Sequence, residues 1–126
     1  ENPRVKIGAL GQMDVQTLLM ASALLITDFS SIQFDFAYML KPEIYYQFDE
    51  ARYWGTHHDR GYFDYRVDGF GAVVTTQEAL LQAIETALAS ECAVTPEMQK
   101  HIRDTFGALD DHNCERNHQA IRELMS

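Results

Sequence analysis

Residues 27–31 have the composition of an anion-binding loop. They read TDFSS and lie between a short apolar run and a predicted helix. The first backbone N–H groups of a helix have no partner within it, and the helix dipole favours negative charge at that end. Small hydroxyl side chains add donors and allow close approach. The segment therefore predicts a phosphate or diphosphate site in which Ser30 and Ser31 bind the anion without a lysine.

Asp35 follows Ser31 by four residues and shares its face of the predicted helix. A carboxylate at this position could accept hydrogen bonds from sugar hydroxyls or from nearby N–H groups. A plainer interpretation is equally open, in which Ser30 is a helix N-cap, Gln33 completes a capping box and Asp35 is solvated. The segment has neither a P-loop lysine nor a GxGxxG pattern, so it supports neither an NTPase nor a dinucleotide site.

The elements that must position this loop alternate along the chain. Strands are predicted at residues 5–7, 23–27, 43–47 and 72–74. Helices are predicted from Asp14 to about 22, from 31 to about 40, from a Thr75 capping box to about 90, from Thr95–Pro96, and from about 113 to 125. Residues 49–71 are expected to be irregular. This alternation predicts an α/β fold with a parallel sheet and right-handed crossovers.

Several apolar patterns predict burial. The continuous apolar run 23–27 favours a strand covered on both faces. The helix over 31–40 is apolar on two sides, which indicates burial between layers or contact with a partner domain. Inward-facing side chains of the other helices are expected at 15, 18, 19 and 22, and at 80, 81, 84 and 88.

Composition excludes several classes of protein. The chain has 126 residues, 46% of them hydrophobic, and a net charge of −9, which suits one globular domain. This charge argues against a nucleic-acid binder and against a polybasic membrane-surface module. No segment has the length and apolarity of a membrane helix or the pattern of a signal peptide. The first residue is not Met, which suggests a piece of a larger protein, and Cys92 and Cys114 are expected to be free thiols.

The aromatic side chains are concentrated in one part of the chain. Thirteen of the fourteen lie between Phe29 and Phe70. Core burial is the default for some of them, and a contact surface is the alternative for those at 53–65. The adjacent His57 and His58 fall in this region and are expected to be an exposed pair; His101, His112 and His118 are expected at the surface.

Residues 24–35, LLITDFSSIQFD, resemble the LITDYSS–xx–FD signature of the CDP-glycerol glycerophosphotransferase family of teichoic-acid-type polymerases. Further segments resemble later family motifs in the same order: 41–46 (KPEIYY), 48–49 (FD), 60–65 (RGYFDY), 69–74 (GFGAVV) and 110–116 (DDHNCER). The chain departs from the family where Phe70 and Ala72 replace prolines and Asp111 replaces a glycine.

The resemblance implies a Rossmann-like, three-layer parallel sheet similar to the C-terminal domain of a GT-B glycosyltransferase, with extra C-terminal helices. Residues 1–126 would form a single donor-binding lobe of a longer enzyme. Its donor would be CDP-glycerol or a related CDP-alditol, with no cofactor and no metal. By motif position, Ser30 and Ser31 would bind the donor diphosphate, with Asp28 bracing the turn and Asp35 next to the ribose. The positions implied as cleft support are Thr27, Glu115 and Arg116.

The resemblance also implies a transferase that adds glycerol phosphate to a cell-wall or capsule polymer. The acceptor would be a polyol phosphate or glycan, and the catalytic histidines would lie upstream, in a missing N-terminal domain. This chain alone would then be inactive. The enzyme would be cytoplasmic, with peripheral membrane contact at the inner face made by other parts of the protein. Two alternatives stay open: the donor lobe of a sugar-nucleotide GT-B glycosyltransferase, and a non-enzymatic α/β interaction module.

Overall fold

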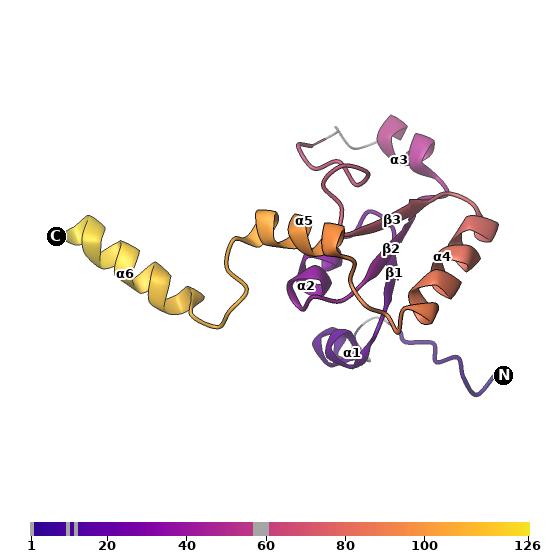
Figure 1. The fold of residues 1–126 in the computed structure, drawn as a ribbon, viewed down its shortest axis with the longest axis horizontal. Coiled ribbons are helices and arrows are strands. Elements are labelled where there is room, and N and C mark those ends of the chain that lie inside the picture. The colour runs from indigo at the N-terminus through magenta and orange to yellow at the C-terminus, as the bar shows by residue number, and fades with distance from the viewer. Residues whose placement is uncertain (1, 10, 12, 57–60) are drawn as a thin grey trace.

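Three parallel strands form the centre of the molecule (Figure 1). The computed structural model describes residues 2–9, 11, 13–56 and 61–126. The strands pair in the order β1-β2-β3, and their bounds are β1 (Leu25–Thr27), β2 (Glu43–Tyr46) and β3 (Gly71–Val74). Thr27 pairs with Tyr45, which pairs in turn with Val73, so the carboxyl ends of the strands share one edge of the sheet. The predicted α/β class with a parallel sheet is confirmed.

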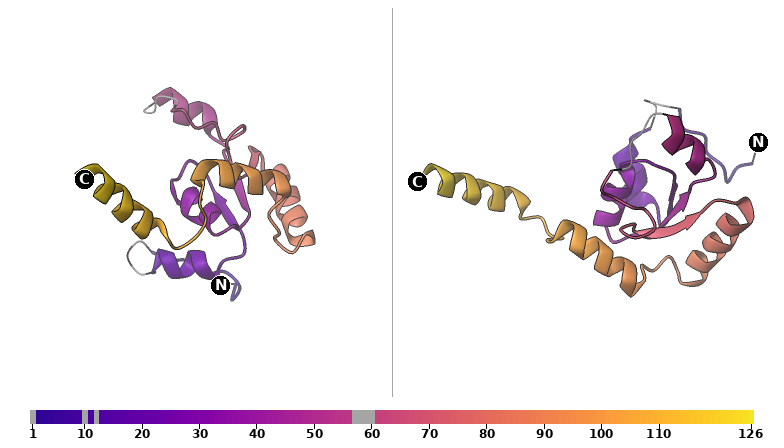
Figure 2. Two further views of the ribbon diagram at one scale, coloured as in Figure 1. Left: turned by 60° about the vertical axis from the view of Figure 1, so that its left-hand side comes forward. Right: turned by 90° about the horizontal axis from the view of Figure 1, so that it is seen from above.

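Helices cover both faces of this sheet. The structure places six in the described residues: α1 (Val15–Ala21), α2 (Ile32–Tyr38), α3 (Glu50–Thr56), α4 (Gln77–Ala89), α5 (Pro96–Phe106) and α6 (Asn113–Met125). α2 packs on β1 and β2 with α5 against it, and α4 lies on the opposite face of β2 and β3 (Figures 1 and 2). The three-layer arrangement therefore agrees with a Rossmann-like fold.

Side-chain caps explain where three of the six described helices begin. The Asp14 carboxylate accepts the Thr17 N–H at 3.3 Å before α1, and the Thr95 hydroxyl accepts the Met98 N–H at 3.3 Å before α5. Both caps were expected from the sequence. The predicted Thr75 capping box is wrong, because the Thr76 hydroxyl makes the capping bond one residue later, to the Ala79 N–H.

Lys41 links α1 to the start of β2. Its ammonium group donates to three carbonyl oxygens at the C-terminal end of α1, those of Leu19, Met20 and Ser22, at 2.6–2.9 Å. These carbonyls have no partner within the helix, and a cation is favoured at this end of the helix dipole. The contact holds α1 beside the sheet although none of its residues is buried.

The core lies between the sheet, α2 and α5. Phe36 and Ala37 of α2 are fully buried, as are Tyr45 of β2 and Ile102 of α5, and Phe70 is 1% exposed. α2 therefore has apolar contacts on both its sheet side and its α5 side. The prediction that this helix is buried between layers is confirmed.

Some apolar segments predicted to be buried lie at the surface instead. Residues 5–7 do not form the predicted strand: Val5 is 62% exposed, Ile7 is 94% exposed, and no strand pairs with them in the described chain. β1 is not buried on both faces, since Ile26 is 43% exposed at the edge of the sheet, where α4 makes no strong contact. Four predicted inward positions are also exposed: Val15, Leu18, Leu81 and Leu88.

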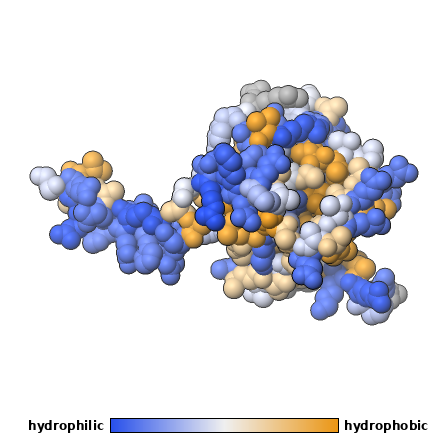
Figure 3. Space-filling view, in the orientation of Figure 1, coloured by the Kyte–Doolittle hydropathy of each residue, from blue (hydrophilic) through white to orange (hydrophobic). Residues whose placement is uncertain are grey.

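α6 extends away from the rest of the molecule (Figures 1 and 2). All of its residues are exposed, and its surface is largely hydrophilic (Figure 3). The Tyr38 hydroxyl holds its start, because it donates to the Asp110 carbonyl at 2.8 Å and accepts from the Asn113 amide at 3.2 Å. The helix predicted over 113–125 is confirmed.

Within the described ranges, no helix combines the length and apolarity needed to cross a lipid bilayer.

Candidate functional site

The segment 27–31 lies where β1 ends and α2 begins, at the carboxyl edge of the parallel sheet (Figure 1). Thr27 is the last residue of β1, Ser30 is half-buried, and Asp28 and Ser31 are exposed. In open α/β sheets this edge is where ligands bind. The predicted place of this segment, between a strand end and a helix start, is therefore confirmed; its binding of a phosphate remains a prediction.

The two serines are arranged differently from the predicted capping box. Ser31, not Ser30, is the N-cap of α2, and its side chain makes no capping hydrogen bond. The Ser30 hydroxyl instead accepts the Ile32 N–H at 3.4 Å. Gln33 does not turn back toward Ser30, because its side chain is buried beneath the helix with only 2% exposed. The Ser31 hydroxyl is thus not committed to capping the helix.

Asp35 lies one turn further along α2 and is exposed. It lines a groove of about 540 Å³ between α1 and α2, together with Val15, Leu19 and Met39 among others. The structure therefore places the Asp35 side chain beside α1. Its predicted role next to the ribose remains a prediction.

Phe29 connects the loop to a cluster of aromatic rings. Its ring stacks on Tyr53 with centroids 3.9 Å apart and planes 5° from parallel. It also meets the edges of Trp54 at 5.6 Å and Tyr65 at 5.7 Å. Aromatic pairs in such geometries contribute about 0.5–1.5 kcal/mol beyond area burial. The loop therefore rests against α3 and the segment that follows residue 60.

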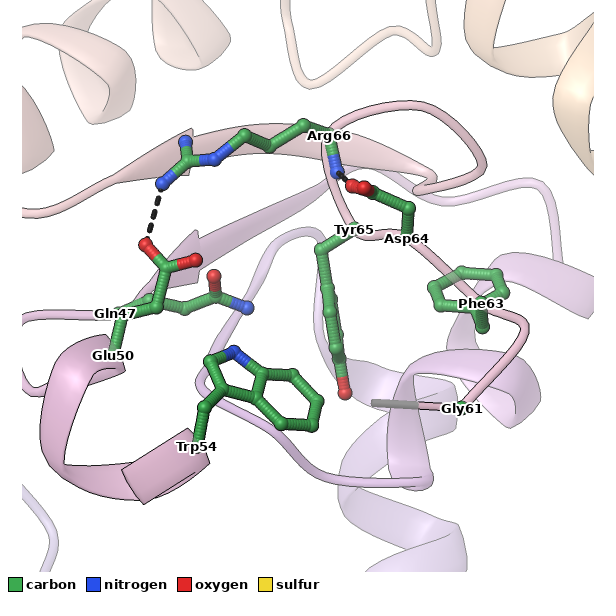
Figure 4. Close-up of a pocket in the computed structure, with 8 residues that line it drawn as sticks. All are labelled: Gln47, Glu50, Trp54, Gly61, Phe63, Asp64, Tyr65 and Arg66. Carbon is green, nitrogen blue, oxygen red and sulfur yellow. Dashed lines mark hydrogen bonds and ion pairs between the residues drawn. The ribbon is translucent and has the colours of Figure 1, made fainter. Parts of the chain in front are cut away.

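A pocket of about 240 Å³ opens beside these rings (Figure 4). Gln47, Glu50 and Trp54 line it from one side, and residues 61 and 63–66 line it from the other. The Glu50 carboxylate accepts from the Arg66 guanidinium at 2.7 Å, and the Asp64 carboxylate accepts the Arg66 backbone N–H at 2.8 Å. The pocket therefore combines aromatic walls with carboxylates and a paired guanidinium.

Three polar side chains are buried in the described part of the molecule. Gln33, Glu43 and Gln47 are each 2–3% exposed, and each has at least one side-chain atom without a hydrogen-bond partner in the described residues. Gln47 directly follows β2 and lines the pocket. Leaving a buried donor or acceptor unpaired costs about 1–3 kcal/mol. A buried polar group without a partner calls for an explanation, and for Gln47, at the carboxyl edge of the sheet, a bound ligand would supply one.

The pKa of the Tyr65 hydroxyl depends on its burial and on three neighbouring side chains. Burial raises the pKa of this hydroxyl, and the neighbouring Tyr53 and Asp28 raise it further. A hydrogen bond with Gln33 opposes these effects and lowers the pKa. Tyr65 therefore stays a neutral phenol that can donate a hydrogen bond at physiological pH.

Sequence reasoning missed the pocket. Residues 49–71 were expected to be irregular, yet 50–56 form α3, which brings Glu50 and Trp54 to the sheet edge. One signal was present: Glu43, Tyr45 and Gln47 alternate along β2 and so share the sheet face under α2. The predicted exposed pair His57–His58 lies outside the described residues.

The remaining predicted positions lie at the C-terminal side. Arg116 pairs with Asp110 at 2.7 Å, and Glu115 lies 3.1 Å from the His112 ring. Both are on α6, which points away from the sheet (Figure 1), so the structure does not bring them next to Ser30. Their predicted support of the cleft remains a prediction. His101 is half-buried rather than at the surface, with Nδ1 2.9 Å from the Gly69 carbonyl.

Comparison with known proteins identifies similar chains. The chain is 35% identical over 109 residues to the minor teichoic acid biosynthesis protein GgaB of Bacillus subtilis (strain 168), covering 86% of this chain and 12% of that protein. It is 36% identical over 72 residues to a teichoic acid glycerol-phosphate transferase of Staphylococcus aureus (strain NCTC 8325 / PS 47), covering 57% and 18%. It is 40% identical over 75 residues to a teichoic acid poly(glycerol phosphate) polymerase of Bacillus subtilis (strain 168), covering 57% and 10%.

The chain thus spans less than a fifth of the length of these relatives. No solved structure matches it. The model of one protein family, CDP-glycerol:poly(glycerophosphate) glycerophosphotransferase, matches residues 6–121, which is nearly the whole chain. On this match, and on the ordered motifs within it, the chain belongs to the CDP-glycerol:poly(glycerophosphate) glycerophosphotransferase family.

Proposed function

We propose that this chain is the donor-binding part of a glycerophosphotransferase of teichoic acid synthesis. The donor is CDP-glycerol or a related CDP-alditol, and the acceptor is a polyol-phosphate or glycan polymer. The observation that carries the proposal is the position of the family signature, residues 27–31, at the carboxyl edge of the parallel sheet. The rest of the enzyme, including an N-terminal domain and any contact with the inner membrane face, lies outside this chain.

The loop has the chemistry to hold a diphosphate. The hydroxyls of Ser30 and Ser31 lie beside the N-terminal N–H groups of α2, and a bound phosphate oxygen accepts hydrogen bonds from either kind of donor. Diphosphate binding through hydroxyl and backbone N–H groups needs no excess of basic residues, so it is compatible with the net charge of −9. Thr27, the last residue of β1, joins the loop to the sheet, and by its motif position Asp28 is proposed to brace the turn.

The proposed reaction is a displacement at phosphorus. An acceptor hydroxyl attacks the phosphorus that carries glycerol; the new P–O bond forms as the bond to the bridging oxygen breaks, and CMP leaves. A base outside this chain takes the hydroxyl proton. Ser30, Ser31 and the helix N–H groups stabilise the negative charge that builds on the departing phosphate. Positioning and electrostatics supply most of the rate in such transfers.

Replacing both serines should weaken donor binding. In the double variant Ser30→Ala/Ser31→Ala we expect CDP to bind at least about tenfold more weakly, because two hydrogen bonds to a charged group are lost. Isothermal titration calorimetry of the chain with CDP measures this effect. Ser90→Ala, at the exposed C-terminal end of α4, is the matched control and should bind CDP like the wild type.

Two results would contradict the proposal. Unchanged CDP affinity in the double variant would remove the two serines from the site. Tighter binding of UDP-glucose than of CDP-glycerol would instead assign the chain to the sugar-nucleotide glycosyltransferases.

A further inference from the structure

The pocket beside the aromatic rings contains an unused buried donor. The Gln47 side chain is 2% exposed, and its amide nitrogen has no hydrogen-bond partner in the described part of the chain. Figure 4 shows this nitrogen directed toward the space between the rings of Trp54 and Tyr65. Because a buried unpaired donor is unfavourable, the pocket is suited to a ligand that supplies an acceptor at this point.

Two acidic residues also line the pocket. They are Glu50 and Asp64, and among the described lining residues the guanidinium is that of Arg66, which is already paired with Glu50 at 2.7 Å. Two carboxylates and a neutralised arginine disfavour a phosphate in this space. A hydroxyl group both accepts and donates, so adjacent hydroxyls match a donor amide facing carboxylates. Aromatic walls suit the C–H faces of the same group.

The pocket also lies within reach of the proposed diphosphate site. Phe29, next to Ser30 in the chain, contacts the ring of Trp54 at 5.6 Å and that of Tyr65 at 5.7 Å. The residue next to Ser30 in the chain is therefore in contact with two walls of the pocket. A group bonded to phosphate is present on each side of a CDP-alditol, as the ribose and as the alditol.

We infer that this pocket binds the vicinal hydroxyls of a phosphate-linked polyol. The Gln47 amide donates a hydrogen bond to one hydroxyl oxygen, and Glu50 or Asp64 accepts a hydrogen bond from a hydroxyl group. The inference rests on the proposed function in one respect, namely that the phosphate lies at Ser30 and Ser31. Ribose and alditol share this chemistry, and the experiment separates them.

Trp54 is the chain's one tryptophan, so its fluorescence reports directly on the pocket. The probes are glycerol 3-phosphate, ribose 5-phosphate, CMP and propyl phosphate, the last of which keeps the phosphate but lacks hydroxyls. We expect at least one polyol phosphate to bind about tenfold more tightly than propyl phosphate. Preference for glycerol 3-phosphate assigns the alditol to the pocket, and preference for ribose 5-phosphate assigns the ribose.

The Gln47→Leu variant should abolish this preference while leaving propyl phosphate binding unchanged. Gln47→Glu keeps the shape of the side chain but replaces the amide donor, so it should also abolish the preference. This variant provides the test if Gln47→Leu does not fold. Gln119→Leu on the exposed α6 is the matched control and should retain the preference.

Three outcomes overturn the inference. Equal affinity for propyl phosphate and both polyol phosphates means that only phosphate is bound, and the proposed function then stands without this pocket. A response to CMP alone means that the pocket takes the nucleobase. A preference that persists in both Gln47 variants means that the hydroxyls bind elsewhere. If neither CDP nor any phosphate probe binds, the proposed function itself fails.

Discussion

A Glu43→Gln variant should be more stable than the wild-type chain at pH 8, by on the order of 3 kcal/mol, and nearly equal to it at pH 5. Glu43 begins β2, is 3% exposed, and neither carboxyl oxygen accepts a well-formed hydrogen bond from the described residues. Burial raises the pKa of this carboxyl to about 8, against partial opposition from the Ala37 N–H and the Tyr45 hydroxyl. Glutamine keeps the shape and carries no charge.

The direction of the pH effect follows from proton binding. The folded chain keeps the Glu43 proton up to about pH 8, whereas the unfolded chain releases it near the ordinary value of 4.5. The wild type therefore loses stability as the pH rises through this interval, and the variant does not. Urea unfolding at pH 5, 6.5 and 8 measures the difference, with the exposed Glu85→Gln as control. A difference between Glu43→Gln and wild type that stays constant across these pH values would contradict a neutral buried Glu43.

Gly71→Ala should destabilise the fold by about 3 kcal/mol or more. Gly71 begins β3 and pairs with Glu43 of β2. A Cβ atom at Gly71 would lie 1.9 Å from the Glu43 carbonyl oxygen and 2.6 Å from its carbonyl carbon. Both are backbone atoms of a central strand, so relief of the clash requires the two strands to separate where β3 joins the sheet.

Gly55→Ala is the matched control for this substitution. Gly55 lies in α3, and a Cβ there meets no atom of the described residues within 4 Å. Alanine is favoured over glycine inside a helix by about 1 kcal/mol, so this variant should be equally or more stable. Thermal unfolding of the two variants compares them directly. A Gly71→Ala chain that melts with the wild type would show that β2 and β3 do not approach as closely as described.

The sequence predicted well those features that depend on neighbouring residues. The Asp14 and Thr95 caps lie beside the groups they bind, so they follow from local spacing. The position of residues 27–31 at a strand end also followed, because a five-residue apolar run before a helix is sufficient to indicate it. Features that depend on distant partners were predicted less well. The apolar triplet 5–7 looks like a strand, yet no neighbouring strand pairs with it in the described residues.

In the candidate site, too, the features that depend on distant residues were not predicted from the sequence. The Ser30 capping box failed because Gln33 is buried near Tyr65, a residue 32 positions away in the chain. The pocket was not predicted because its walls come from the end of β2, from α3 and from residues 61–66, which meet only after folding. Glycines and aromatics in 49–71 obscured the short helix α3, whose packing against Phe29 outweighs its weak helical pattern.

Binding of a donor diphosphate by residues 27–31 can be observed residue by residue, by following the backbone amide signals of the chain by NMR as CDP is added. We expect the largest changes in chemical shift to fall within residues 27–35 and to disappear in the Ser30→Ala/Ser31→Ala variant. CDP that shifts no signals, or shifts those of the α1–α2 groove or α6 instead, would contradict this binding.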